Sequence, residues 1–308
     1  MRLVHLADLH LGFRQYHRLT PKGLNQREAD IAGAFQRAID RVIALKPDVV
    51  LFAGDVFHSV RPNNSSIIHA FSQLSRLRIE APESIVVMVS GNHDGPRSTE
   101  TGCILRLFSQ LGIHVADVEP RRLLFPEKNL SILAVPHAIG ALPALTPSVE
   151  ARFNVLLLHG EVEGVLPSYM TRMDRASPVI THEDLGSSRW SYVALGHYHV
   201  YHSWKVAPNT YYSGALEYTT PNVWGEIQEE REAGISGKGF IEYDLETARH
   251  RFHALEPSRK MLDLAPIHAR GLSAPEVDAE IRSRIEGCDG GIDDRIIRLV
   301  IRDVPRHI

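Results

Sequence analysis

The most constraining feature of the chain is a series of short, almost continuous apolar runs separated by amphipathic segments. The runs cover residues 2–7, 48–54, 84–91, 130–136, 154–160 and 192–196. Helical patterns lie between the first of them, over about 26–46, 64–78 and 102–111. Strands that are apolar along their whole length are buried on both faces, as in parallel sheets covered by helices. The first two-thirds of the chain therefore predicts an α/β domain.

The pattern changes after the sixth run. Residues 217–238 are polar and Gly-rich, which predicts a long loop, and residues 240–256 predict a β-hairpin. Pro257 and the charges that follow it indicate a boundary. We therefore expect a large domain over residues 1–257 and a small one over residues 258–308.

The small domain has two predicted elements. A helix over 274–287 carries Val277, Ile281 and Ile285 on one face, with a proline at its start. An apolar stretch over 295–304 predicts a strand. This combination indicates a small domain of mixed strands and helix.

Composition excludes several classes of protein. No apolar run approaches the ~20 residues needed to span a bilayer, and the amino terminus does not resemble a signal peptide. We therefore expect a cytoplasmic protein without a membrane partner. The only two cysteines, Cys103 and Cys288, lie far apart, which fits a reducing compartment. The net charge of −3 rules out a general basic field, so any DNA contact must come from local patches or bound metal.

Five motifs rich in Asp, Asn and His follow five of the apolar runs. They are ADLHLG with Asp8 and His10, AGDVFH with Asp55 and His58, SGNHDGPR with Asn92, His93 and Asp94, LLLHGE with His159, and LGHYHV with His197 and His199. Ligands of open α/β sheets bind outside the carboxyl ends of the strands, so these side chains are expected to converge. Taken alone, the last motif fits a His-rich polar loop equally well.

The donor set indicates a metal centre without structural thiolates. Carboxylates, imidazoles and one amide accept Mn, Fe or Zn, and the sequence does not choose among them. Seven donors are too many for one ion and suit two ions that share a bridging carboxylate. Two such ions can activate water and clamp a phosphoryl group for in-line attack.

The motifs DLH, GDVFH, GNHD, HGE and GHYH match, in order, the signature of the calcineurin-like metallophosphoesterases. More narrowly, HLADLHLGFRQY, GDVFHSVRPN and YYSGALEYT resemble the SbcD-type exonucleases of DNA double-strand-break repair. The resemblance covers about residues 1–256, and the tail resembles the start of that family's capping domain more weakly. It implies a calcineurin-like core of sheets flanked by helices, followed by a small α/β capping domain.

The resemblance also implies how the donors divide between two divalent ions, with Mn²⁺ expected. The first ion would be held by Asp8, His10, Asp55 and His199, and the second by Asp55, Asn92, His159 and His197. Asp55 would bridge the two ions. His197 and His199 would therefore serve different ions from one short segment.

Further roles follow from the same resemblance. His93 would stabilise the transition state or protonate the leaving oxygen, and Asp94 would orient the His93 ring. His58 would help to position the substrate. Arg14 and Arg61 are candidates for contacts with the DNA phosphate backbone.

The expected function is a manganese-dependent DNA nuclease, a 3′→5′ exonuclease on duplex ends and an endonuclease on single strands or hairpins. The resemblance implies a homodimer and an SbcC-type coiled-coil ATPase partner. Chains of this family usually continue beyond this length, and their later segment binds the ATPase. Since this chain stops at Ile308, we do not expect it to bind that partner tightly.

Two alternatives remain open from the sequence. A phosphodiesterase acting on a nucleotide or another small molecule would have the same metal ligands and differ only in the surrounding groove. A scaffold that holds DNA ends and an ATPase would be free to lose ligands. Against the scaffold, none of the seven donors is missing.

Overall fold

We describe a computed structural model of the chain over residues 1–96, 102–137, 142–165, 179–203, 207, 209–235 and 237–304. The chain divides into two compact units, Met1–Glu256 and Pro257–Ile308, and each is described by itself. Within the described residues, no helix is both long enough and apolar enough to cross a bilayer.

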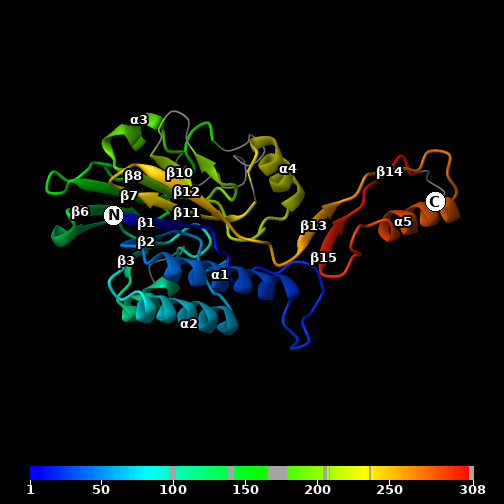
Figure 1. The fold of residues 1–308 in the computed structure, drawn as a ribbon, viewed down its shortest axis with the longest axis horizontal. Helices are drawn as coiled ribbons and strands as arrows, with labels where there is room; N and C mark the ends of the chain where they lie inside the picture. Colours follow the sequence, from blue (N-terminus) through cyan, green and yellow to red (C-terminus); the bar gives the residue numbers. More distant parts are fainter. Residues whose placement is uncertain are drawn as a thin grey trace. The chain divides into compact units, whose positions relative to one another are not determined.

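The first unit contains two six-stranded sheets (Figure 1). The first sheet has the order β12-β11-β1-β2-β3-β4, with β1–β4 parallel and β11–β12 an antiparallel hairpin. Its strands are β1 (Arg2–Leu6), β2 (Val49–Ala53), β3 (Ile85–Val89), β4 (His114–Ala116), β11 (Gly239–Asp244) and β12 (Arg249–Ala254).

The second sheet has the order β5-β6-β7-β8-β10-β9. Strands β6, β7, β8 and β10 are parallel, while β5 and β9 are antiparallel strands at the two edges. Its strands are β5 (Arg121–Phe125), β6 (Leu130–Val135), β7 (Phe153–His159), β8 (Tyr192–Gly196), β9 (His202–Ser203) and β10 (Thr210–Tyr212).

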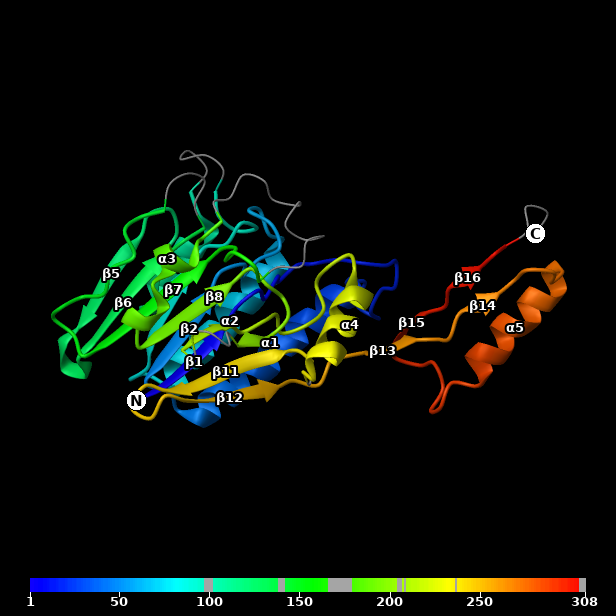
Figure 2. The same cartoon turned by 90° about the horizontal axis from the view of Figure 1, so that it is seen from above.

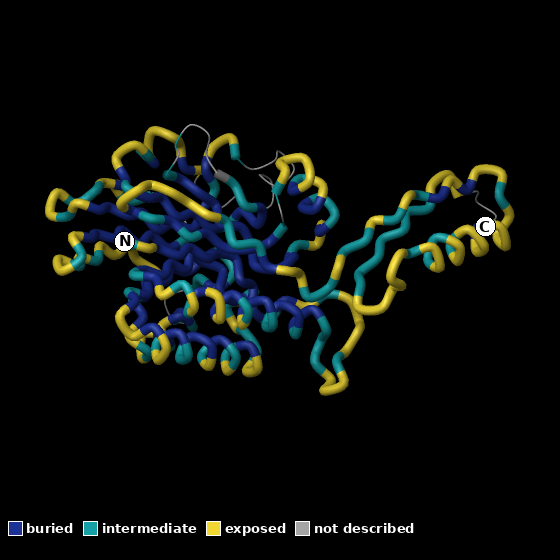
Figure 3. The backbone as a smooth tube through the Cα atoms, viewed as in Figure 1, coloured by how far each residue is buried: buried dark blue, intermediate teal, exposed yellow. Residues whose placement is uncertain are grey.

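The two sheets pack face to face, and helices α1 (Gln26–Leu45) and α2 (Asn64–Glu80) cover the outer face of the first sheet (Figures 1 and 2). Side chains of β2 alternate between these layers, because Val50 and Phe52 face the helices while Leu51 faces the second sheet. All five residues of β2 are buried, as the unbroken apolar run predicts (Figure 3).

Helix α1 follows its sequence pattern closely. The side chain of Asn25 caps its first turn by accepting the backbone N–H groups of Arg27 and Glu28. The apolar stripe that includes Ile31 and Phe35 is buried against the first sheet. Burial of each such side chain contributes about 1.5–3 kcal/mol relative to exposure.

The outer face of the second sheet is covered by shorter segments. Helix α3 (His182–Leu185) and the adjoining 3₁₀ turn η3 (Ser187–Arg189) place Leu185 and Trp190 on this face. Two other 3₁₀ segments lie elsewhere in the unit: η1 (Ile104–Leu111) between β3 and β4, and η2 (Pro126–Lys128) between β5 and β6. The helix expected near 102–111 is thus a 3₁₀ helix.

One expected loop is wrong: helix α4 (Val223–Ala233) occupies the middle of residues 217–238. Asn222 caps the first turn and Gly234 ends the helix in a left-handed conformation. The buried positions follow helical spacing, but two of the four, Glu226 and Glu230, are acidic. An apolar periodicity therefore could not show this helix.

The second unit contains α5 (Ala274–Glu286) and the parallel strand pairs β13 (Lys260–Asp263) with β15 (Arg295–Arg298) and β14 (Ile267–His268) with β16 (Ile301–Arg302). The single strand expected over 295–304 is therefore two short strands. A capping box between Ser273 and Glu276 begins α5. Its description as a capping domain stays a prediction.

Candidate metal centre

All seven predicted metal ligands lie at or just beyond the carboxyl ends of β1, β2, β3, β7 and β8. Three sets of side chains place potential ligand atoms within 4.8 Å of one another. The sets are Asp8–His10–His199, Asp8–Asp55–His159 and His10–His58–His93. The structure thus brings together residues that are up to 191 positions apart in the sequence, as the strand-end argument predicts.

Four of these ligands have an unusual backbone conformation. The φ angles of Asp8, His10, Asp55 and His197 are +53°, +47°, +51° and +109°. Left-handed backbone is uncommon for residues other than glycine and is costly, so surrounding contacts must hold it. Backbone bonds from the Asp8 N–H to the Gly54 carbonyl (3.1 Å) and from the His10 N–H to the Asp55 carbonyl (2.9 Å) tie the two loops together.

The two sheets approach each other closely at this edge. The His197 backbone N–H lies 3.1 Å from both carboxylate oxygens of Asp8, which joins the end of β8 to the end of β1. A Cβ atom at Gly196 would overlap the Ala53 carbonyl oxygen, so only glycine permits this approach.

The tautomer of His159 can be assigned from its partners. Its Nδ1 lies 2.8 Å from the Ala53 carbonyl oxygen, which only accepts, so Nδ1 carries the proton. The remaining lone pair on Nε2 faces Asn92 Oδ1 at 3.0 Å and Asp55 Oδ2 at 3.6 Å. Burial holds the pKa of His159 well below its usual value, so Nε2 carries no proton that it could donate to these two oxygens. The lone pairs of the nitrogen and the two oxygens therefore point toward one another, an arrangement that fits a bound cation.

A second convergence joins His10 and His199. Their Nε2 atoms are 3.0 Å apart, so at most one of them carries a proton. The carboxylate of Asp55 lies 3.6 Å from the same Nε2 of His10. The residues present therefore fit two cations on the two sides of Asp55.

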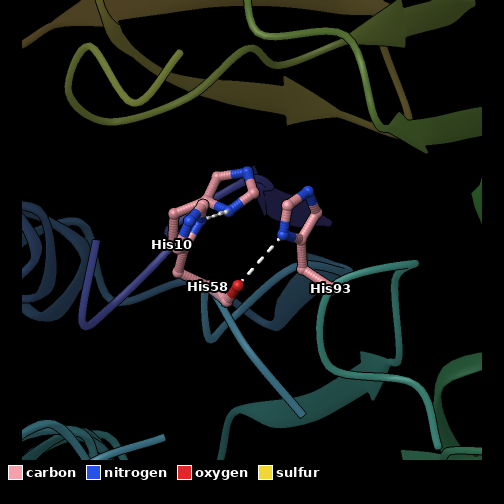
Figure 4. Close-up of side chains that lie close together, drawn as sticks. All are labelled: His10, His58 and His93. Carbon is pink, nitrogen blue, oxygen red and sulfur yellow. Dashed lines mark hydrogen bonds between the residues drawn. The ribbon is translucent and has the colours of Figure 1, made fainter. Parts of the chain in front are cut away.

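The predicted catalytic residue His93 lies at the same edge. Its Nδ1 is 3.0 Å from the His58 carbonyl oxygen and therefore donates to it, which leaves Nε2 available (Figure 4). The His93 backbone N–H donates to Asp55 Oδ1 at 2.8 Å. His93 is thus fixed by the same carboxylate that lies between the two groups of ligands.

His58 contacts two of its neighbours. Its ring Nδ1 lies 3.3 Å from Nδ1 of His10, and its carbonyl oxygen accepts from the His93 ring (Figure 4). Burial and the neighbouring His93 lower the pKa of His58 to about 4, which favours the neutral ring. A neutral His58 ring can accept the Nδ1 proton of His10 and so direct the Nε2 lone pair of His10 to a metal ion.

The interpretation of Asp94 requires a correction. Its buried carboxylate accepts the backbone N–H groups of Val56 (2.6 Å), Phe57 (3.2 Å) and Gly91 (2.7 Å). The ring of His93 is instead held by the His58 carbonyl group. Asp94 therefore positions the loops after β2 and β3 and does not orient the His93 ring directly.

Residues 1–233 match the model of the calcineurin-like phosphoesterase family. The chain belongs to this family. The match confirms the family that the five motifs predict, and the α/β architecture is that of the calcineurin-like phosphoesterase fold. Proteins of this family use divalent metal ions, in agreement with the converging donors.

The chain is also similar to archaeal proteins named "DNA double-strand break repair protein Mre11". It is 25% identical to that of Methanopyrus kandleri over an alignment 329 positions long, gaps included, which covers 98% of this chain and 65% of the relative. It is 38% identical over 102 residues to that of Methanococcus maripaludis, covering 33% and 25% of the two chains. It is 28% identical over 211 residues to that of Saccharolobus solfataricus, covering 65% of this chain and 49% of the relative. The chain thus spans between a quarter and two-thirds of these relatives.

In this calcineurin-like phosphoesterase, protons would compete with a metal ion for the predicted ligand atoms. Burial raises the pKa of Asp8 to about 7, and the Asp55 carboxylate also raises it. Burial acts to lower the pKa of His199, but Glu226 and Asp8 outweigh it and the pKa is raised. Metal binding must therefore release protons at and below neutral pH.

We expect Mn²⁺ to bind about 30-fold more weakly at pH 5.5 than at pH 8, because one proton must leave a group with a pKa near 7. A carboxyl group with a raised pKa stabilises the metal-free fold below its unfolded pKa of about 4, and that stability is lost as pH rises through 7. The rise in melting temperature caused by Mn²⁺ should therefore be larger at pH 8. Calorimetric titration and thermal melts at both pH values test this, and a pH-independent affinity would contradict it.

The two predicted DNA-contact residues are exposed, but the structure places neither against the metal ligands. Arg14 is 58% exposed at its side chain and pairs with Glu28 at 2.6 Å. Arg61 is exposed, and its backbone N–H donates to Ser59 Oγ. Their contact with DNA stays a prediction.

Residues next to the ligands were missed by sequence reasoning. Thr219 Oγ1 lies 3.3 Å from His199 Nδ1, and the buried Glu226 lies 3.7 Å from the same atom. Lys238 donates to the His199 carbonyl oxygen at 2.8 Å. These residues lie within or at the end of the segment expected to be a loop, and no motif marked them.

Proposed function

We propose that this chain is the phosphodiesterase-bearing part of a two-metal DNA nuclease of double-strand-break repair. The observation that carries the proposal is the convergence of acidic, amide and imidazole donors from five strand ends around Asp55, with His93 fixed beside them. The names of the archaeal relatives support DNA as the substrate.

We propose the ligand division that the resemblance implies. Asp8, His10, Asp55 and His199 would hold one divalent ion, and Asp55, Asn92, His159 and His197 would hold the other. When bound, the two ions would polarise the scissile phosphate and make a water molecule more nucleophilic. Backbone groups hold two of the proposed donors before binding: the Ala53 carbonyl accepts from the His159 ring, and the His197 N–H donates to the Asp8 carboxylate.

In this proposal His93 acts on the substrate. Its Nδ1 is committed to the His58 carbonyl, so Nε2 is the atom that can approach the phosphate or the leaving oxygen. A proton on Nε2 would stabilise charge on the phosphate and could pass to the leaving 3′ oxygen. His58 would hold the rings of His10 and His93 in place.

The finer features of the proposal come from the sequence resemblance. We propose Mn²⁺ as the ion, 3′→5′ exonuclease action on duplex ends and endonuclease action on single strands or hairpins. We also propose that the nuclease to which this phosphodiesterase part belongs acts as a homodimer with an SbcC-type ATPase, while residues 1–308 by themselves are not expected to bind the ATPase tightly.

The test is incubation of a 5′-labelled linear duplex with the purified chain and Mn²⁺, beside a sample with excess chelator. We expect a ladder of shortening 5′-labelled products that the chelator abolishes, because a 3′→5′ exonuclease leaves the 5′ label on every product. Hydrolysis of bis-p-nitrophenyl phosphate, measured in parallel, reports whether the centre is active on any diester.

Hydrolysis of the small diester without cleavage of the duplex, a single strand or a hairpin would contradict the nuclease proposal for this chain. It would favour a phosphodiesterase that acts on nucleotides or other small molecules. Inactivity on every diester, with metal bound, would leave the scaffold alternative.

A further inference from the structure

The metal ligand His199 is backed by a buried cluster of charged side chains. The cluster consists of Glu226 and Glu230 on α4 and Lys238, which lies just before β11. Their side chains are only 4%, 5% and 2% exposed. Charged groups are rarely buried to this degree unless each is paired, because their removal from water is costly.

Lys238 is fully partnered. Its ammonium group has three protons and three acceptors: Glu226 Oε2 at 2.5 Å, Glu230 Oε1 at 2.9 Å and the His199 carbonyl oxygen at 2.8 Å. The Ala215 backbone N–H donates to the same carbonyl at 3.0 Å. The backbone of His199 is therefore fixed from two directions.

The ring of His199 is fixed as well. Its Nδ1 faces the Thr219 hydroxyl at 3.3 Å and Glu226 Oε1 at 3.7 Å. A proton on Nδ1 can be donated to the Thr219 hydroxyl, with the Glu226 carboxylate near enough to attract it electrostatically, and this leaves the Nε2 lone pair on the side of His10. Two carboxylates and one ammonium carry a net negative charge, which a cation held by His199 would offset.

Glu226 and Glu230 differ in one respect. Both pair with Lys238, but only Glu226 faces the His199 ring, while Glu230 Oε2 accepts from the Tyr218 hydroxyl at 2.7 Å. If the cluster only stabilised the fold, loss of Glu226 and loss of Glu230 should have similar effects. If the cluster also holds His199 for metal binding, only the loss of Glu226 should weaken metal binding.

We propose that Glu226, supported by Lys238 and Thr219, is a positioning residue that fixes the tautomer and orientation of His199 and so tunes one ion of the centre. This inference rests on the proposed two-ion centre. It predicts that substitution of Glu226 lowers the affinity for the ion held by Asp8, His10 and His199. The affinity for the ion held by Asn92, His159 and His197 should not change. Within the described structure, the second group of ligands forms no hydrogen bond or ion pair with the cluster.

The test is Mn²⁺ titration of the Glu226→Gln variant by calorimetry and by the electron paramagnetic resonance signal of free Mn²⁺. We expect one of two binding events to weaken by about 10–100-fold, the usual effect of losing an outer partner of a ligand, with the other unchanged. Glu230→Gln is the matched control, because it removes a charge from the same lysine and leaves His199 untouched. It should change neither affinity by more than about twofold.

Thr219→Val is a second variant, nearly equal in volume, and should weaken the same binding event. Melting of the metal-free variants shows that each is folded. Equal effects of Glu226→Gln and Glu230→Gln, or two unchanged binding events in Glu226→Gln, would overturn the inference. Because the readout is metal affinity, it decides the inference even if the chain cleaves no DNA.

Discussion

Replacement of His93 by alanine is expected to reduce diester hydrolysis by about 10²–10⁴-fold, the usual contribution of a positioned acid or base. Neither ring nitrogen of His93 belongs to the proposed ligand groups, so Mn²⁺ should bind the variant with unchanged stoichiometry. The backbone N–H that donates to Asp55 is kept by the substitution. The variant should therefore have a complete metal centre that turns over slowly.

The measurement is hydrolysis of bis-p-nitrophenyl phosphate and of labelled duplex DNA, with metal content determined on the same samples. His69→Ala is the control, because His69 is half-buried and bonds to the Ala32 carbonyl oxygen of α1. It should keep full activity. An active His93→Ala variant would show that His93 is not a catalytic residue, and loss of bound metal would show that its role is structural.

The positions of the proposed metal ligands could be predicted from sequence because each follows a strand. An apolar run identifies a buried strand, and the next polar residues must then lie at its carboxyl end. Asp8, Asp55 and Asn92 follow three neighbouring parallel strands, and His159 ends a strand of the facing sheet. The strand-end argument also predicts that the motifs converge, but that they do so from two sheets packed face to face is a property of the tertiary packing that the apolar runs do not show.

The residues around the ligands could not be predicted in the same way. The resemblance implied that Asp94 orients the His93 ring, but the Asp94 carboxylate bonds to three backbone N–H groups of two loops. Glu226 and Glu230 on helix α4 are buried because both pair with Lys238, which lies after the helix and just before β11. An ion pair between a helix and a residue that follows the helix leaves no periodic signal in a single sequence.

Replacement of Asp55 by asparagine is expected to have the largest effect on metal binding. Asp55 Oδ2 lies 3.6 Å from Nε2 of both His10 and His159, on the two sides of the proposed centre. Loss of this shared charge should lower the affinity for both ions. The decrease should exceed the usual effect of losing an outer partner of a ligand, which is about 10–100-fold. Diester hydrolysis should fall below detection, and Mn²⁺ should no longer raise the melting temperature.

The metal-free Asp55→Asn variant should be more stable than the unsubstituted protein. An asparagine Oδ1 can still accept the His93 backbone N–H, and its amide N–H can donate to the His159 Nε2 lone pair. The Asp55 charge also adds to the effect of burial in raising the pKa of Asp8 to about 7 and of Asp94 to about 8, so its removal relieves repulsion.

If this relief is worth about 1 kcal/mol, the melting temperature of the metal-free protein rises by about 2–4 °C. Thermal melts of both proteins at pH 8, with chelator and with Mn²⁺, test the two effects together. A misfolded variant would melt lower under both conditions, whereas a metal-binding role for Asp55 requires a higher melting temperature without metal and no response to Mn²⁺. A variant that Mn²⁺ still stabilises would mean that Asp55 does not bridge the ions, and the division of ligands proposed here would have to be redrawn.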